Sequence, residues 1–332
     1  MSAAALLEIR GLTISYPSDA GLIEAVRDVD LTLLDGECLG LVGESGSGKS
    51  QLLLAILGLL APRARLRGSI RYRGQELVGA SASELNQVRG KCIGMVFQDP
   101  MTALNPYLRV GRQITEGLRQ HSTMRRRDAR HRAIELLESL QVPDAAHRMT
   151  QYPHELSGGM RQRVMIAIAL ITQPQILLAD EPSTALDVTV QAQILNLLRE
   201  LRTRTGTAIV LVTHDLAVMA EMADRVAVMY AGRIAEHSGV EELFANPRHP
   251  YTEGLQYSIP RFDAPRPERL PSIAGVPPRA SCLPPGCAFA ARCLYRLAVC
   301  ETTVPALTQV SPGHWKACHH AGALGRLHEH PP

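Results

Sequence analysis

The chain has 332 residues, of which 45% are hydrophobic and 20% charged, and its formal net charge is +3. This length is enough for a large core with more than one subdomain, and the small net charge gives no argument for a nucleic-acid partner. The longest apolar run, Leu52 to Ala61, is broken by Gly58 and is much shorter than the ~20 residues that span a bilayer. No signal peptide is predicted, since the N-terminus lacks a basic segment followed by an apolar one. The seven cysteines are predicted to be thiols or metal ligands rather than disulfides.

Three segments near the N-terminus alternate apolar and polar residues with the period of a β-strand. They are Leu6 to Tyr16, Ala25 to Leu34 and Gly68 to Arg73. Such alternation is typical of antiparallel strands with one face in the core, so these segments predict a small antiparallel sheet.

A glycine-rich loop lies between the second and third of these segments. It reads GESGSGKS, follows a short apolar strand, Cys38 to Val42, and precedes a helix-forming stretch, Lys49 to Leu60. This is the context that a phosphate-binding loop requires. Lys49 is expected to reach the terminal phosphates of a nucleoside triphosphate, and Ser50 to coordinate Mg²⁺. The expected nucleotide-binding residues are Gly43, Glu44, Ser45, Gly46, Ser47, Gly48, Lys49 and Ser50, with the turn made at Gly46 and Gly48.

Beyond Gln98 the pattern changes from strand to helix. Val110 to Gln120 and Arg125 to Gln141 have apolar residues at helical spacing, which predicts an inserted helical subdomain at about residues 100–172. The basic run Met124 to Arg132 could touch lipid head groups, but we interpret it as the solvated face of a helix.

A second anion-binding segment is predicted at Leu156 to Met160, which reads LSGGM. Ser157 is the expected N-cap of a helix over Arg161 to Thr172. The backbone N–H groups at the start of that helix would face an anion.

An acidic pair is predicted at the carboxyl end of a buried parallel strand. The apolar run Gln175 to Leu178 leads to Asp180 and Glu181, at the edge where open α/β sheets bind ligands. Asp180 is expected to hold Mg²⁺ through water, and Glu181 to orient and polarise the attacking water. Neighbours on a strand point to opposite faces, so the two acids are expected to differ in role. His214, which follows the strand Ala208 to Val212, is expected at the same kind of edge.

These motifs, in this order, resemble the nucleotide-binding subunits of ABC transporters over residues 6 to about 260. The resemblance implies ATP and Mg²⁺ as ligands, and a dimer in which the signature of each subunit binds the γ-phosphate of ATP on the other. It implies that Tyr16 stacks on adenine, that Gln98 links Mg²⁺ and water to the membrane-domain contact, and that His214 contacts the γ-phosphate. The other implied residues are Ser157, Gly158 and Gly159 of the signature, Asp187 at the partner's phosphate loop, and Ser50, Gln98 and Asp180 around Mg²⁺.

Two features resemble the oligopeptide and dipeptide branch of that family. The signature ends in Met160, whereas most family signatures end in Gln, and members of this branch often read HELSGGMRQR. The stretch His249 to Thr252, followed by Leu255 to Pro260, resembles the HPYT…SIP of oligopeptide, dipeptide and nickel importers, although its local chemistry indicates only a loop leading into a short helix. Beyond a proline-rich linker, Pro260 to Pro278, the segment Gly286 to Cys293 is similar to the GCxFxxRC pattern of the branch's longer subunits.

Four cysteines near the C-terminus have the spacing C-x5-C-x6-C-x17-C. Four thiolates suit zinc or iron–sulfur chemistry, but the spacing lacks the close C-x2-4-C pairs of structural zinc sites. We therefore expect a structural iron–sulfur cluster of the 4Fe-4S type, with zinc and unliganded thiols as alternatives. Such a cross-link would supply folding energy to a segment with few large apolar residues. The expected ligands are Cys287, Cys293, Cys300 and Cys318; Cys282 is a possible substitute, and His314, His319 and His320 are expected to lie in a tail or loop.

Together these patterns predict an α/β fold: a P-loop NTPase (RecA-like) core with an antiparallel β subdomain, an inserted helical subdomain and a Cys-rich C-terminal extension. The expected domains are 1–260 and 261–332. The predicted function is that of an ATP-hydrolysing, energy-coupling subunit of an ABC importer for di- and oligopeptides. Nickel chelates, glutathione and other small peptide-like cargo are the alternatives.

The resemblance also implies the partners. These are a second nucleotide-binding subunit, commonly a paralogue, two transmembrane permease subunits and an extracytoplasmic solute-binding protein, with the chain peripheral on the cytoplasmic face of a bacterial inner membrane. A single phosphate loop, and no coiled coil or zinc module between Ser50 and Leu156, disfavour a soluble translation or DNA-repair ATPase of the superfamily. Glu181 disfavours a scaffold that binds ATP without hydrolysing it.

Overall fold

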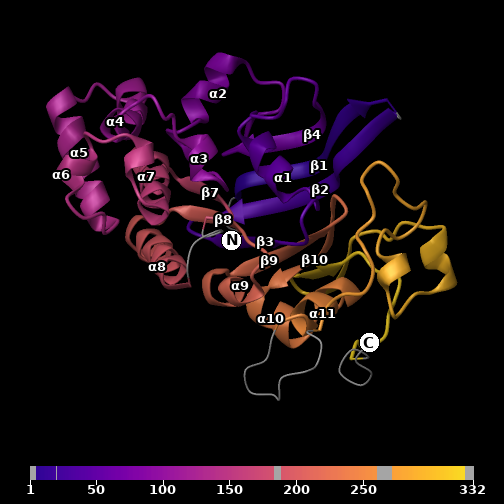
Figure 1. Cartoon of the computed structure of the whole chain (residues 1–332). Coiled ribbons are helices and arrows are strands. Elements are labelled where there is room, and N and C mark those ends of the chain that lie inside the picture. The colour runs from indigo at the N-terminus through magenta and orange to yellow at the C-terminus, as the bar shows by residue number, and fades with distance from the viewer. Residues whose placement is uncertain (1–4, 20, 183–187, 260–270, 326–332) are drawn as a thin grey trace. The chain divides into compact units, whose positions relative to one another are not determined.

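The computed structural model describes residues 5–19, 21–182, 188–259 and 271–325. They form two compact units, each built from separate stretches of the chain. Figure 1 shows the helices and strands, coloured by residue number. Unit 1 is mainly Gln75–Val212. Unit 2 combines Leu7–Thr32, Leu39–Gly74 and the chain from Thr213 onward.

Unit 1 is organised around three parallel strands in the order β8-β7-β6. Every residue of these strands is buried, and near-continuous apolar strands are what a parallel sheet covered on both faces requires. The elements of the unit are β5 Gln75–Glu76, α2 Ala82–Val88, β6 Ile93–Val96, α3 Pro100–Ala103, α4 Val110–His121, α5 Arg126–Ser139, α6 Ala145–Arg148, the 3₁₀ helix Pro153–Glu155, α7 Gly158–Leu170, β7 Ile176–Asp180, α8 Val188–Thr205 and β8 Ala208–Val212.

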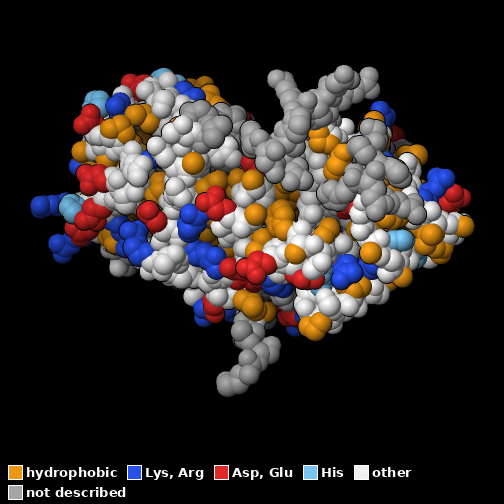
Figure 2. Space-filling view, turned by 90° about the horizontal axis from the view of Figure 1, so that it is seen from below, with side chains coloured by type: hydrophobic (Ala, Val, Ile, Leu, Met, Phe, Trp, Pro, Cys, Tyr) orange, Lys and Arg blue, Asp and Glu red, His pale blue; other side chains and the backbone are white. Residues whose placement is uncertain are grey.

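The chain between β6 and β7 is helical, in agreement with the periodicity of the sequence. On α5 the buried residues are Ala129, Ala133 and Leu137, one turn apart on a single face. Most of the basic run Met124 to Arg132 is exposed. Acidic and basic side chains are intermixed on the side where α5 lies (Figure 2), as on a solvated helix face.

Unit 2 contains an antiparallel sheet, and β1 pairs with β4 as expected, with Leu7 opposite Tyr72 and Ser15 opposite Arg65. In a second set of strands, β3 runs parallel to β9, and β10, β12 and β11 follow with antiparallel pairing. The elements are β1 Ala5–Ser18, β2 Gly21–Leu34, β3 Cys38–Val42, α1 Lys49–Ile56, β4 Arg65–Tyr72, α9 Leu216–Met222, β9 Arg225–Tyr230, β10 Arg233–Gly239, α10 Val240–Ala245, α11 Pro250–Tyr257, the 3₁₀ helices Ala290–Arg292 and Ala298–Glu301, β11 Thr308–Ser311 and β12 His314–Lys316. Periodicity gave no sign of β11 and β12.

The helix after the glycine-rich loop is shorter than predicted. Leu52, Leu53 and Ile56 of α1 are buried, but the helix ends at Ile56 and a turn at Leu57 and Gly58 follows. None of the helices in the described residues is both long and apolar enough to span a bilayer.

Candidate functional site

The loop between β3 and α1 is closed by the first residue of the helix. Lys49 is 6% exposed, and its Nζ donates to the carbonyl oxygens of Gly43 at 2.7 Å and Glu44 at 3.0 Å. Ser47 Oγ lies 3.3 Å from the same nitrogen. The amino group is therefore held inside the loop, at the N-terminus of α1.

The turn of the loop is made at the two glycines where it was predicted. Gly46 and Gly48 have φ values of 78° and 103°. A Cβ atom at Gly48 would lie 2.5 Å from the carbonyl oxygen of Ala25, so no larger residue fits there. A narrow loop with a buried ammonium group at a helix N-terminus is suited to bind phosphate groups, which need both positive charge and N–H donors. The loop thus fits the triphosphate of a nucleotide.

Tyr16 lies beside the same helix. Its hydroxyl donates to the side-chain oxygen of Gln51, the third residue of α1, and burial raises the pKa of the phenol. This contact places the half-buried ring of Tyr16 next to the phosphate loop. Stacking on adenine stays a prediction.

In unit 1, polar residues follow the ends of two neighbouring parallel strands. Gln98, just after β6, donates from Nε2 to Oε2 of Glu181 at 3.1 Å, and Glu181 directly follows β7. Asp180 is the last residue of β7 and is 5% exposed. An exposed amide, an adjacent carboxylate and a second, buried carboxylate thus occupy the carboxyl edge of this sheet.

Asp180 and Glu181 differ in position, but strand alternation, which was the expected reason, is not the cause. Glu181 has φ of 47°, and its N–H donates to the carbonyl oxygen of Val212 at 2.9 Å, at the end of β8. The backbone therefore leaves the strand at Glu181 in the left-handed region, and strand alternation does not determine where this side chain points.

The LSGGM segment begins α7. Ser157 is the N-cap, as predicted, because its Oγ accepts a hydrogen bond from the N–H of Met160 at 3.3 Å. The helix starts at Gly158, three residues earlier than expected. Leu156 is buried while Ser157 and Gly158 are exposed, and no atom lies within 4 Å of where a Cβ of Gly158 would be. The start of α7 is accessible to a ligand within this unit.

Sequence reasoning missed Gln162 on the same helix. It is 2% exposed, and its side-chain amide donates to the carbonyl oxygen of Pro182, the residue after Glu181. The signal was a polar residue at a position whose neighbours Val164 and Ile166 are apolar and buried. This contact ties the signature helix to the segment that follows the acidic pair.

His214 lies in unit 2, just after β8, and is exposed. It does not cap the following helix. Asp215 does so, since its carboxylate accepts from the N–H groups of Ala217 at 2.8 Å and Val218 at 3.4 Å. Asp187 lies outside the described residues.

The four cysteines of the C-terminal extension lie in unit 2, where neighbouring thiols contribute to the raised pKa values of Cys287, Cys293 and Cys318. Burial raises the pKa of Cys293 to about 12, and the neighbouring thiols Cys318, Cys287 and Cys300 raise it further. The pKa values of Cys287 and Cys318 are also raised, mainly by burial. The Cys287 N–H donates to the carbonyl oxygen of Cys300 at 2.8 Å, whereas Cys282 is exposed.

Within the described residues, no group of three or more His, Cys, Asp or Glu side chains is arranged to hold a metal ion. The donor set nevertheless fits iron–sulfur chemistry. Three half-buried thiols and one buried thiol that repel each other as thiolates would be stabilised by a cationic group bound among them.

The expectation that His314 lies in a tail or loop is wrong. It begins β12 and is fully buried, and its Nε2 lies 2.7 Å from Oε1 of Glu236, which is also fully buried. The reason is the pairing of β12 with β10, which carries the ring into the core of unit 2. His319 and His320 follow the strand and lie outside regular structure, as predicted.

The HPYT stretch contacts the phosphate loop, which its local chemistry did not indicate. His249 is the N-cap of α11, and Tyr251, in the first turn of this helix, is fully buried. The Tyr251 hydroxyl accepts a hydrogen bond from the Glu44 N–H at 2.8 Å. The Glu44 carboxylate pairs with Arg292, whose Nη1 lies 2.6 Å from Oε2.

Comparison with protein families gives two matches. Residues 26–184 match the ABC transporter family, and residues 235–300 match the C-terminal region of oligopeptide/dipeptide transporters. Among solved structures, the dimeric post-hydrolysis state of the ATP-binding cassette MJ0796, bound to ADP and Pi, is similar with a TM-score of 0.65 and 30% identity, over 70% of this chain and 98% of that one.

Curated relatives are similar over almost their whole length. A protein of Brucella abortus that is provisionally named a peptide import ATP-binding protein is 52% identical over 309 residues, 93% of each chain. The oligopeptide transport ATP-binding protein OppD of Escherichia coli is 48% identical over 316 residues, 95% of this chain and 93% of OppD. Both the predicted ATPase fold and the predicted branch are confirmed. The chain belongs to the ABC transporter ATPases, in the branch that carries the oligopeptide/dipeptide transporter C-terminal region.

Proposed function

We propose that this chain hydrolyses ATP to drive import of oligopeptides or dipeptides. The observation that carries the proposal is the hydrogen bond from Gln98 to Glu181 at the carboxyl edge of the parallel sheet. A carboxylate held there by an amide is suited to orient and polarise a water that attacks the γ-phosphate. The peptide cargo is supported by the C-terminal region and by the names of the relatives.

We propose for the site residues the roles that the sequence predicts. Lys49 and the loop N–H groups would bind the β- and γ-phosphates, and Tyr16 would stack on adenine. Oxygen ligands suit Mg²⁺, whose charge would neutralise the phosphates during transfer. The proposed Mg²⁺ residues are Ser50, Gln98 and Asp180; His214 would contact the γ-phosphate.

A dimer is part of the proposal. The exposed start of α7, at Ser157 and Gly158, is suited to bind the γ-phosphate on a second subunit, with Gly159 beside it and Asp187 at that subunit's phosphate loop. Closure and reopening of two such subunits would be passed to two permease subunits at the cytoplasmic face of the inner membrane, with a solute-binding protein delivering the cargo. The second subunit would be a paralogue or another copy.

We also propose a structural 4Fe-4S cluster on Cys287, Cys293, Cys300 and Cys318. This proposal is supported by the raised pKa values of Cys287, Cys293 and Cys318, to which the neighbouring thiols contribute, and by the burial of Cys300. When bound, the cluster would cross-link the extension and lower the pKa of its thiol ligands.

The test is to express the chain with the two permeases and the solute-binding protein of its transporter, and to measure ATP turnover in the purified complex. Peptide-loaded binding protein should stimulate hydrolysis, and mass spectrometry of the ligands carried by the binding protein should identify peptides. Nickel chelate or glutathione as the stimulating cargo would replace the peptide assignment. Robust hydrolysis by a strictly monomeric preparation, established by light scattering, would refute the two-subunit site.

A further inference from the structure

We propose that Arg292, in the Cys-rich extension, is a positioning residue for the phosphate loop, because it neutralises and fixes Glu44. The inference rests on the proposed function, since it concerns the same nucleotide site. It adds a role for the C-terminal extension, which is to set the affinity of the loop for ATP.

Glu44, in the phosphate loop, makes hydrogen bonds through its carbonyl oxygen, its N–H group and its carboxylate. Its carbonyl oxygen accepts from Lys49 Nζ at 3.0 Å, the bond that holds the lysine inside the loop. Its N–H donates to the Tyr251 hydroxyl at 2.8 Å, and its carboxylate accepts two bonds from Arg292. The partners of the N–H group and of the carboxylate, Tyr251 and Arg292, both come after position 250 in the sequence. Arg292 of the extension and Tyr251 of α11 thus hold Glu44, which in turn holds the phosphate-loop lysine.

Arg292 and Glu44 form a bidentate ion pair. Nη1 lies 2.6 Å from Oε2 and Nη2 lies 2.9 Å from Oε1, the fork geometry that binds carboxylates most strongly. The Arg292 side chain is 4% exposed and that of Glu44 is 28% exposed. Poor access of water weakens the screening of this pair, and a guanidinium is not deprotonated in proteins.

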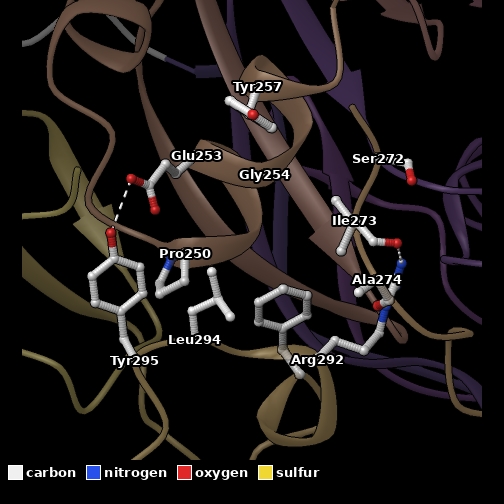
Figure 3. Close-up of a pocket in the computed structure, with 11 residues that line it drawn as sticks. Pro250, Glu253, Gly254, Tyr257, Ser272, Ile273, Ala274, Arg292, Leu294 and Tyr295 are labelled. Atoms are coloured by element: carbon white, nitrogen blue, oxygen red, sulfur yellow. Dashed lines mark hydrogen bonds between the residues drawn. The ribbon is translucent and has the colours of Figure 1, made fainter. Parts of the chain in front are cut away.

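Arg292 is itself held by the extension. Nε donates to the carbonyl oxygen of Ala274 at 2.9 Å and Nη2 to that of Ile273 at 3.3 Å. Figure 3 shows Arg292 beside Ile273 and Ala274, at a pocket that Glu253, Tyr257 and Tyr295 also line. Its guanidinium lies 5.9 Å from the ring centres of Tyr230 and Phe289. Arg292 also ends the 3₁₀ helix between Cys287 and Cys293. The conformation of the thiol-bearing segment therefore determines where the guanidinium lies.

The electrostatic consequence follows from where Glu44 lies. A carboxylate in a loop that binds a triphosphate repels it, unless a cation neutralises the carboxylate. Loss of the Arg292 charge would leave Glu44 as an uncompensated anion beside the phosphates. Loss of both charges would remove the repulsion. Affinity for ATP should thus fall when only the Arg292 charge is removed, and recover when the Glu44 charge is removed as well. A purely structural role for Arg292 does not produce this pattern.

The experiment measures binding of a fluorescent ATP analogue with Mg²⁺ to the full-length chain. Arg292→Gln should weaken binding by about tenfold, and Glu44→Gln added to it should restore the affinity to within roughly threefold of the unmodified chain. Arg296→Gln is the matched control, because Arg296 lies in the same extension, is exposed and only approaches Glu301 at 3.8 Å. It should leave binding unchanged.

Two results would overturn the inference: unchanged affinity in Arg292→Gln, or a double variant that binds no better than Arg292→Gln. If Arg292→Gln does not fold, Arg292→Lys replaces it, since it keeps the charge without the fork. Its binding should weaken by about two- to threefold, and unchanged binding would again count against the inference. Lys49→Ala separates this question from the proposed function. If Lys49→Ala also leaves binding unchanged, the nucleotide site is wrong; if only Lys49→Ala weakens it, the role of Arg292 is wrong.

Discussion

The side-chain amide of Gln98 donates to the carboxylate of Glu181 across neighbouring ends of β6 and β7. The same backbone segment is fixed twice more, by the bond from the Glu181 N–H to Val212 and by the amide of Gln162 on Pro182. Such a fixed position suits the role proposed for Glu181, since small displacements of a group that orients a water cost much of the rate.

The first prediction concerns the chemical step. Glu181→Gln should keep affinity for Mg-ATP but lower turnover by at least about 100-fold, because an amide cannot accept a proton from the attacking water. A closed dimer with bound ATP should accumulate, visible by size-exclusion chromatography. Glu138→Gln, an exposed acid on α5 of the same unit, is the control and should be active. Near-normal hydrolysis in Glu181→Gln, with the second site of the dimer also disabled, would contradict the assignment.

The second prediction separates the structural role of Ser157 from its proposed role in binding. Ser157→Ala removes the N-cap of α7 and should lower stability by about 1 kcal/mol. Ser157→Asp keeps a good N-cap, so its thermal unfolding should resemble that of the unmodified chain. The added negative charge would nevertheless repel the γ-phosphate of the second subunit and abolish ATP turnover in the complex. Full turnover in the Asp variant would exclude this contact.

The third prediction concerns the C-terminal cysteines. Anaerobically purified protein should be brown, with broad absorbance near 400 nm and roughly four irons per chain. Cys293→Ser should lose the colour and the iron. Cys282→Ser, which changes an exposed thiol outside the four, should keep both. Colourless anaerobic protein with stoichiometric zinc would favour a zinc site and leave the ATPase unaffected.

The fourth prediction is a loss of stability in mild acid. Burial lowers the pKa of His249 and that of His237 to about 4, from an ordinary value near 6.5. The folded protein keeps both rings neutral while the unfolded chain takes up protons below pH 6.5. Stability should therefore be complete above about pH 6.5 and fall steadily between pH 6.5 and 4. Thermal unfolding at several pH values in this range measures the slope.

A substitution at His249 is the control for this dependence of stability on pH. Its Nδ1 accepts from the Tyr251 N–H at 3.0 Å, so protonation there would break the N-cap of α11. Asn can make the same cap but does not titrate. His249→Asn should have a lower melting temperature at neutral pH, because a packed ring is lost, and a flatter dependence on pH. An unchanged slope would assign the acid sensitivity to other groups.

The sequence predicted those parts of the site whose chemistry is local. A strand, a glycine turn and a lysine stand next to each other in the chain, and so do Ser157 and the helix that it caps. The carboxyl edge was also predictable, because apolar strands ending in Asp180 or followed by His214 obey the rules of parallel sheets. Contacts between residues that are distant in sequence could not be predicted. The Glu44 contacts span 207 and 248 residues, and no periodicity in one sequence reports them.

Where prediction failed, tertiary contacts outweighed local pattern. His314 looked like a tail residue because few large apolar residues surround it in sequence, yet strand pairing with β10 buries it. Glu181 looked like the next residue of a strand, but a bond to Val212 turns the backbone there. Both outcomes depend on an element elsewhere in the chain, which only the three-dimensional structure supplies.

The burial of Glu236 limits how far this chain can be shortened. Its carboxylate accepts from the N–H groups of Arg248 and His249 and lies against the ring of His314. A nucleotide-binding fragment ending at Ile259 would lack that ring and leave a buried acid short of a partner. It would also bare the edge of β10 that β12 covers, and open strand edges recruit other chains. Such a fragment would precipitate, although every motif for ATP is present in it.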